Sequence, residues 1–261
     1  MKKSLISLLV LSICLPVSLH AIPEKAKREY YKIVVYHFKT NEQKLAIDNY
    51  LQNAWLPALH RMGITKIGVF TPIANDTVID KRIFIVAPVK SLEVAIDIPN
   101  KLAKDESYQQ AAKDYLEAVY NNPPFTRMEN ILTLAFPDAP QLELPQLKSE
   151  KSEHIYEYRS YESPTEKLFR NKVQMFNEGG EIPLFKRLNF NGIFYSEVIA
   201  GSNMPNLIYM TSFENIADRD AHWKTFGADP EWKKLSSDPI YQHNVSKVES
   251  TLMKATSYSD Y

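Results

Sequence analysis

The feature that most constrains the fold is an internal repeat. The same order of elements, strand, helix, two strands, broken helix and strand, occurs before and after a proline-rich segment near position 140. Because the spacing between matched residues varies only from 120 to 126 positions, the differences fit within loops. The sequence therefore predicts a tandem duplication of one βαββαβ module of about 124 residues. The matched residues are Tyr31 with Tyr156, Pro57 with Pro183, Gly68-Val69-Phe70 with Gly192-Ile193-Phe194, Ser91-Leu92-Glu93 with Ser212-Phe213-Glu214, Asp105 and Tyr108 with Asp229 and Trp232, and Arg127-Met128-Glu129 with Lys247-Val248-Glu249.

Local patterns place the elements within each copy. Apolar residues recur every three or four positions from Ile47 to Met62, which predicts a helix that Pro57 kinks. Ser91 and Asp105 are expected to cap the two parts of the broken helix. Apolar and β-branched runs predict the strands, at 31–38, 64–71, 82–87 and 127–136 in the first copy and at 155–161, 190–200, 207–213 and 245–255 in the second.

The first residues are typical of a signal peptide. Lys2 and Lys3 precede an apolar run of about 13 residues, which is shorter than the roughly 20 needed to span a bilayer. The small residue Ala21 suits cleavage, so residues 1–21 are predicted to be removed and the mature chain to begin at Ile22. The mature protein is therefore expected to be secreted or periplasmic, without a stable membrane span.

Cys14 is the only cysteine of the chain and lies inside this leader. Cleavage at Ala21 leaves the mature protein with no disulfide, no thiolate metal site and no cysteine nucleophile. An alternative remains open, because Leu11-Ser12-Ile13-Cys14 partly resembles the processing site of a lipoprotein.

The charge and the composition of the chain limit the classes of partner it can attract and indicate where its domains end. The chain has 31 basic and 31 acidic residues, so no overall field attracts nucleic acid or an anionic membrane, and a small-molecule ligand is the default expectation. Several prolines and a charged stretch follow Phe136, which indicates a linker. The predicted organisation is a first module at 22–137, a linker at 138–152 and a second module at 153–261.

The second copy resembles the NIPSNAP family over about 100 residues. The first copy matches less well, because Lys32 and Val34 replace the glutamate and arginine of the opening strand and residues 105–108 lack the proline of the helix start. The resemblance rests on three motifs: the opening strand Tyr156-Glu157-Tyr158-Arg159-Ser160-Tyr161, the third strand and helix start Asn206-Leu207-Ile208-Tyr209 with Ser212-Phe213-Glu214-Asn215, and the helix start Ala228-Asp229-Pro230-Glu231-Trp232.

This resemblance implies an α+β fold of the dimeric α+β barrel superfamily. Each ferredoxin-like βαββαβ module is expected to carry its helices on one face of a four-stranded antiparallel sheet, and the other face needs covering. Two copies in one chain can cover it internally, which predicts an intramolecular barrel-type pseudo-dimer. The biochemical role of the family is itself unclear, and relatives with this barrel include cofactor-independent and haem-handling monooxygenases.

Side-chain alternation along the opening strands supplies a candidate ligand site. It sends Glu157, Arg159 and Tyr161 to one face of the strand and Tyr156, Tyr158 and Ser160 to the other. The aromatic face is expected to meet the helices, so the charged face should line a cavity between the two sheets, together with Lys32 and Tyr36 of the first copy. Under the alternative interpretation, Arg159 with Glu249 or Glu157, and Lys32 with Glu129, are ion pairs that satisfy one another.

No motif in the sequence specifies a reaction. The histidines of the mature chain are scattered, Asp218 and His222 are interpreted as a solvated helix face, and no phosphate-binding loop or Gly-x-Ser-x-Gly motif occurs. We therefore predict no metal site and no cofactor, and we rank small-molecule binding between the sheets above a monooxygenase-like activity. The sequence leaves the ligand, catalysis and homo-oligomerisation open.

Overall fold

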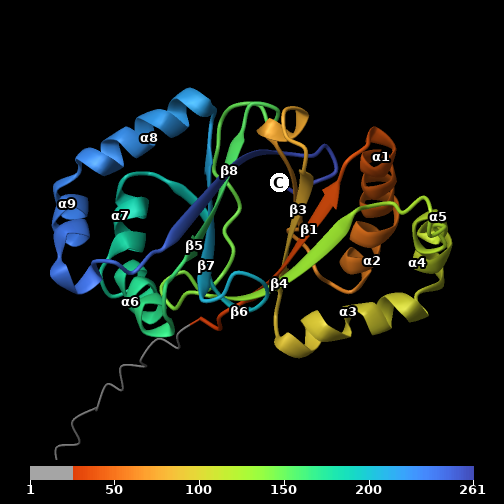
Figure 1. Cartoon of the computed structure of the whole chain (residues 1–261), viewed down its shortest axis with the longest axis horizontal. Helices are drawn as coiled ribbons and strands as arrows, with labels where there is room; N and C mark the ends of the chain where they lie inside the picture. The colour runs from red at the N-terminus through yellow and green to blue at the C-terminus, as the bar shows by residue number, and fades with distance from the viewer. Residues whose placement is uncertain (1–25) are drawn as a thin grey trace, which may run out of the picture.

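The structure, a computed structural model, describes residues 26–261; the predicted signal peptide and Cys14 lie outside this range. Eight antiparallel strands form a closed barrel, and two groups of helices flank it on opposite sides (Figure 1). The elements of the first half are β1 (Tyr30–Phe38), α1 (Asn41–Tyr50), η1 (Leu51–Trp55), α2 (Leu56–Arg61), β2 (Gly68–Pro72), η2 (Ile73–Asp76), β3 (Lys81–Val89), α3 (Leu92–Lys104), α4 (Glu106–Ala111), α5 (Lys113–Leu116) and β4 (Arg127–Ala135). Those of the second half are β5 (Ile155–Glu162), α6 (Glu166–Phe176), α7 (Glu181–Arg187), β6 (Asn191–Ala200), β7 (Asn206–Phe213), α8 (Ile216–Ala228), α9 (Pro230–Ser237), η3 (Pro239–Tyr241) and β8 (Lys247–Ala255).

The strand order confirms the predicted fold class. Each half contributes a four-stranded sheet, in the order β4-β1-β3-β2 and β8-β5-β7-β6, and the two sheets join edge to edge through β2 with β8 and β4 with β6. The first seam pairs Phe70 with Ala255, and the second pairs Leu134 with Glu197. Two ferredoxin-like modules in one chain thus close a barrel without leaving a free sheet edge among the described strands.

Aromatic side chains of both modules fill the interior of the barrel. Tyr31 packs on Phe194, with ring centroids 4.9 Å apart, and Phe84 packs on Tyr158 at 5.1 Å. Phe70 lies 4.8 Å from Tyr156 across the same interior. The expectation that Tyr156 and Tyr158 face the helices is therefore wrong. A barrel of eight strands leaves an interior just wide enough for side chains to fill, and these rings fill it.

Two further segments connect the modules. The segment predicted as a linker packs against the barrel, because Leu142 is buried in the interior cluster and the backbone N–H of Glu143 donates to the carbonyl of Ile193. Beyond β8, the chain crosses to the first module. There the backbone N–H of Thr256 donates to the carbonyl of Val69 in β2, and that of Asp260 donates to the carbonyl of Ile67, just before β2. Both contacts add to the seams that hold the two sheets together.

The broken helices of the two modules have matching caps. Ser91 caps α3, and Asp105 ends it and caps α4; Asn215 caps α8, and Asp229 ends it and caps α9. These positions are 124 residues apart at both ends. The sequence match of Ser91 with Ser212 is therefore wrong by three positions, because Ser212 belongs to β7.

The first long helix contains a π-helical turn where a proline kink was predicted. The backbone N–H of Leu56 donates to the carbonyl of Leu51, and the next residue, Pro57, has no N–H to continue an α-helical pattern. The turn runs directly into α2, so α1, η1 and α2 form one helical arm. This arm presents Tyr50, Leu51 and Trp55 to the outer face of the sheet, where they are buried.

Candidate functional site

A pocket of about 620 Å³ lies between the outer face of the first sheet and the helices that cover it. Its volume is in the range typical of small-molecule sites. The sheet supplies its floor and the helical arm and the broken helix supply its walls, which are mostly apolar. The lining residues are Lys32, Val34, Tyr36, Tyr50, Leu51, Trp55, Ile85, Ile98, Pro99, Leu102, Ala103, Tyr108, Gln109, Tyr115, Leu116, Met128 and Asn130.

Lys32 is the only cationic side chain of this lining. It is the third residue of β1 and is partly buried. Among residues 26–261 its ammonium group has neither a hydrogen bond nor a salt bridge, and the lining contains no carboxylate. Desolvation by burial lowers the pKa of Lys32, as expected for a cation that lacks a compensating partner.

Four tyrosines form two hydroxyl pairs in the wall of the pocket. The hydroxyls of Tyr36 and Tyr115 are 2.9 Å apart, as are those of Tyr50 and Tyr108, and the rings of Tyr50 and Tyr115 stack at 3.7 Å. Burial raises the pKa of Tyr115 to about 12, so its phenol stays protonated at neutral pH. In each pair one O–H donates to the other oxygen, which leaves one hydroxyl hydrogen per pair for a further acceptor.

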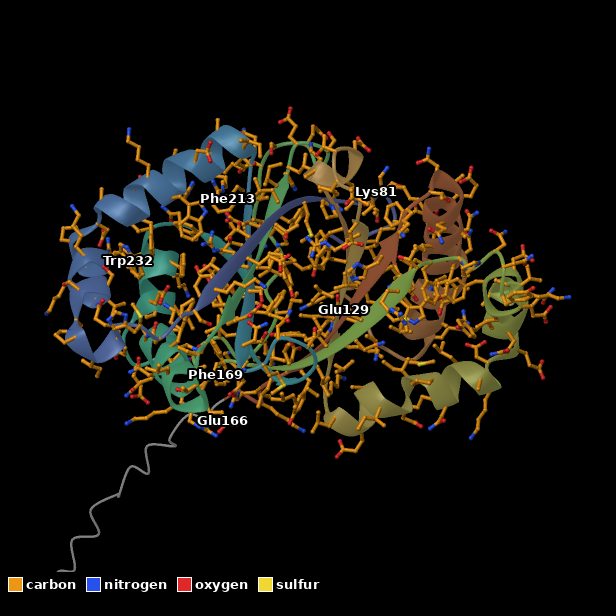
Figure 2. The ribbon with its side chains drawn as sticks, in the orientation of Figure 1. Lys81, Glu129, Glu166, Phe169, Phe213 and Trp232 are labelled. Atoms are coloured by element: carbon orange, nitrogen blue, oxygen red, sulfur yellow. The ribbon has the colours of Figure 1, made fainter. Side chains whose placement is uncertain are left out.

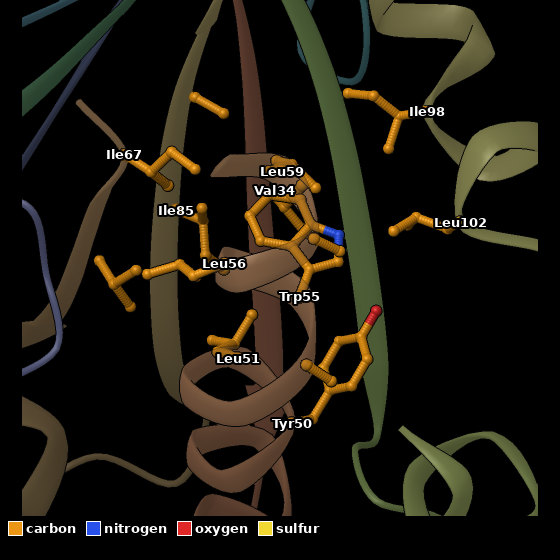
Figure 3. Close-up of a cluster of buried hydrophobic side chains, with 14 of the residues drawn as sticks. Val34, Tyr50, Leu51, Trp55, Leu56, Leu59, Ile67, Ile85, Ile98 and Leu102 are labelled. Atoms are coloured by element: carbon orange, nitrogen blue, oxygen red, sulfur yellow. The ribbon is translucent and has the colours of Figure 1, made fainter. Parts of the chain in front are cut away.

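Trp55 provides another donor. Its side chain is 7% exposed, and its indole N–H makes no hydrogen bond to any residue within the described range. Figure 3 shows the indole nitrogen directed away from Leu56, toward the side where Leu102 of α3 lies. The nitrogen is not among the fully buried side-chain atoms that lack a partner, so its N–H adds a donor that a molecule in the pocket can reach.

In the second module a charged network occupies the corresponding place. Glu157 of β5 is fully buried, and both of its oxygens accept hydrogen bonds from the guanidinium of Arg219 in α8, at 2.9 Å each. Trp223 donates its indole N–H at 2.7 Å and Ser250 donates its hydroxyl at 2.7 Å. Burial alone would raise the pKa of Glu157, but these bonds and the charge of Arg159 lower it to about 2.

Arg159 and Tyr161 belong to the same network. Arg159 donates to Glu157 at 2.6 Å and to the hydroxyl of Tyr161 at 3.0 Å, and its guanidinium lies 4.6 Å from the ring centre of Trp223. Tyr161 in turn shares a hydrogen bond of 2.9 Å with Tyr209. The charges of this module are therefore satisfied internally.

Aromatic rings fill the remaining space between the second sheet and its helices. Phe176, Phe185 and Phe226 lie at the centre of this cluster, and Trp232 lies between α9 and α7 (Figure 2). Phe185 stacks on Phe226 at 4.9 Å, and Phe226 packs on Trp232 at 4.4 Å.

The pocket of the first module exists because smaller side chains stand at the matching positions. The opening strands pair in the same register, with Tyr31 opposite Pro88 and Thr133, and Tyr156 opposite Ser212 and Met253. This register and the matching helix caps align the two modules residue by residue. Val34 replaces Arg159, Ile85 replaces Tyr209, Pro99 replaces Trp223, Leu102 replaces Phe226 and Tyr108 replaces Trp232, and Lys32 takes the place of Glu157.

The five predicted site residues lie on the outer face of the barrel, facing the helices. The expectation that they line a cavity between the sheets is wrong, because the interior takes the alternate residues of β1 and β5. The structure separates them into two groups: Lys32 and Tyr36 line the pocket of the first module, and Glu157, Arg159 and Tyr161 form the network of the second.

Only one of the predicted ion pairs forms. Arg159 pairs with Glu157, as the alternative interpretation allowed, but Glu249 pairs with Arg82. The predicted pairing of Lys32 with Glu129 is wrong, because Glu129 lies opposite Val35 on β1 and contacts His37, two residues further along that strand. Lys32 and Glu129 thus belong to strands that pair, but they do not lie opposite each other, since Lys32 is opposite Leu132.

The sequence interpretation missed Trp55 and the tyrosines Tyr50, Tyr108 and Tyr115 as pocket residues. Trp55 was part of the apolar stripe of a helix, which indicates a core position. The signal that could have found the pocket was the loss of large residues between matched positions, since Pro99 and Leu102 stand where the second copy has Trp223 and Phe226.

Neither a metal centre nor a membrane-spanning helix is found in the described part of the chain. No group of three histidine, cysteine, aspartate or glutamate side chains there is arranged to hold a metal ion. Over the same residues, every helix is too short or too polar to cross a bilayer.

Comparison with known proteins identifies the second module. Residues 156–260 match the NIPSNAP family, which covers the strand with Glu157 and Arg159, the helix with Arg219 and Trp223, and the last strand with Ser250. The second half of this chain is a NIPSNAP domain. The charged network described above therefore lies wholly within it. No curated protein matches the chain.

Several solved structures resemble the fold of nearly the whole chain, and not of the second module alone. A candidate monooxygenase from Lactobacillus acidophilus superposes with a TM-score of 0.55 at 12% identity, over 88% of this chain and 94% of that one. One from Fusobacterium nucleatum gives 0.54 at 9% identity, over 88% and 93%. An anthrone oxidase-like protein gives 0.53 at 8% identity, over 89% and 93%. At these identities the likeness shows the shared barrel fold alone.

Proposed function

We propose that this protein binds a small, largely apolar molecule in the pocket of its first module. The observation that supports the proposal is the contrast between the modules. At matching positions the NIPSNAP domain is filled by aromatic and guanidinium side chains, whereas the first module leaves about 620 Å³ lined by aliphatic and aromatic residues. The expectation of a small ligand is retained, but its site moves from the barrel interior to the space between sheet and helices.

Leu102→Phe tests this proposal, because it introduces the larger ring that Phe226 supplies in the second module. The extra volume is expected to weaken binding of the neutral dye N-phenyl-1-naphthylamine about tenfold, measured by fluorescence titration. Leu45→Phe is the matched control, since Leu45 is 61% exposed on α1. Equal affinities of the two variants, both folded by circular dichroism, would show that the dye binds elsewhere.

We also propose that the mature protein acts outside the cytoplasm. The basic start, the short apolar run and Ala21 support this proposal. Intact-mass analysis of the protein exported from its native host should give a chain that begins at Ile22. A mass that shows an acylated Cys14 would replace this reading with lipoprotein processing.

A monooxygenase-like activity is the alternative, and it rests on the names of proteins that share only the fold. The pocket lining contains neither histidine nor cysteine, the side chains that most often ligate haem iron. Its residues thus do not fit a haem site of that kind, and no reaction step follows from them. Binding is the function that the geometry supports best.

A further inference from the structure

Most of the polar side chains that line the first-module pocket carry hydrogen-bond donors, and only the amides of Gln109 and Asn130 add side-chain carbonyl acceptors. Lys32 offers an ammonium group, Trp55 an indole N–H, and each tyrosine pair one spare hydroxyl hydrogen. No aspartate or glutamate stands among the lining residues to accept these donors. A pocket that offers cationic and neutral donors without an acid is complementary to an anion.

In the NIPSNAP domain, the matching donors surround an acceptor that belongs to the protein itself. There a carboxylate, that of Glu157, sits on the outer face of β5 and receives hydrogen bonds from Arg219, Trp223 and Ser250. The first module inverts this arrangement, because Lys32 occupies the strand position of Glu157. Val34 stands where the NIPSNAP domain has Arg159, so Lys32 is the only charged side chain in the lining.

The free-energy cost of burying Lys32 without an acidic partner suggests that a ligand supplies the partner. Burial of a lysine without an acid is unfavourable, as the lowered pKa of Lys32 reflects. A side chain that served only to fill space would need no charge here, and methionine or leucine would pack against Val34 and Leu102 without that cost. An anionic group of the ligand would offset it by a charge-assisted hydrogen bond.

We infer that the pocket takes an amphipathic carboxylate, whose acid group is held by Lys32 and whose apolar chain lies against the aromatic wall of Trp55 and Tyr50. This inference rests on the proposed function, since it names the chemical class of the ligand for the same pocket. The shape supports a chain rather than a compact anion, because most of the lining is apolar and the cation is single.

Three ten-carbon compounds separate the contributions of charge and chain: decanoate, decanol and decylamine, each titrated by calorimetry at neutral pH. The wild-type protein is expected to bind decanoate about tenfold to a hundredfold more tightly than decanol, because a hydrogen bond to a charged group is stronger than a neutral one. Decylamine should bind more weakly than decanol, because its cation faces Lys32.

Lys32→Met removes the charge and keeps much of the volume, so it should reduce the affinity for decanoate to that for decanol and leave decanol unchanged. Lys32→Arg should keep the preference. Lys104→Met is the matched control, because Lys104 is exposed on α3, one residue beyond the pocket-lining Ala103, and should behave as the wild type.

The pH dependence gives a second readout. Decanoate stays ionised in alkaline solution, so its advantage should disappear as Lys32 loses its proton, below the pH at which an ordinary lysine titrates. In Lys32→Arg the advantage should persist, since arginine keeps its charge.

The outcomes distinguish the inference from the function on which it rests. If decanol and decanoate bind equally well, or if Lys32→Met retains the preference for decanoate, the carboxylate assignment fails while small-molecule binding stands. If none of the three compounds and no neutral dye binds, the proposed function fails as well.

Discussion

Replacing Glu157 with alanine is expected to destabilise the protein by about 3–5 kcal/mol, the cost typical of removing one partner from a buried ion pair. Glu157 is fully buried, and its loss leaves Arg159, Arg219 and Trp223 without the acceptor that orients them. Urea unfolding followed by tryptophan fluorescence gives the free energy of unfolding.

Glu162→Ala is the control on the same strand. Glu162 pairs with Lys247 at the surface, where the lysine is 59% exposed, so its removal should cost at most about 1 kcal/mol. If the two variants lost similar stability, the network around Glu157 would contribute no more than a surface pair, and its role as the polar core of the NIPSNAP domain would be wrong.

The same carboxylate should make stability depend on pH. The folded-state pKa of Glu157, about 2, is below its ordinary value of 4.5, so its contribution is present above pH 4.5 and is lost as the pH falls toward 2. Over that interval the loss should approach about 3 kcal/mol. In Glu157→Gln this part of the pH dependence should be absent, which unfolding midpoints measured across the interval would show.

Much of the fold could be predicted because it depends on local signals. The helix starts at Asp105 and Asp229, and the apolar and β-branched runs that predict the strands, are visible in the sequence and are formed in the structure. The repeated order of elements then indicated one barrel, since a ferredoxin-like sheet has a face that needs covering.

The orientation of the opening strands could not be predicted from their alternation. Period two separates Glu157 from Tyr158 but does not say which of them faces the helices. Aromatic residues are available on both faces, and the interior of the barrel takes Tyr156 and Tyr158 because Phe70 and Phe84 meet them from the other sheet. The charged residues find their partners on α8, at Arg219 and Trp223, and such partners only become visible once the helix is placed.

The two modules should not fold separately into stable monomers. The isolated fragment 22–150 would expose the interior aromatic face that carries Tyr31, Phe70 and Phe84, together with the unpaired edges of β2 and β4. A bare apolar face with free strand edges favours self-association. Size-exclusion chromatography with light scattering should therefore find dimers or larger species in place of a monomer.

Co-expression of 22–150 with 153–261 supplies the decisive comparison. The second fragment brings β8 and β6 to the free edges of β2 and β4, and Tyr156 and Tyr158 to the exposed rings, so the two chains should form a soluble 1:1 complex with the near-ultraviolet circular dichroism of the intact protein. A fragment 22–150 that stays monomeric, with a cooperative unfolding transition of its own, would contradict internal closure. Its aromatic face would then be stable in water without the partner sheet, and the seams between the modules would not be what keeps that face covered.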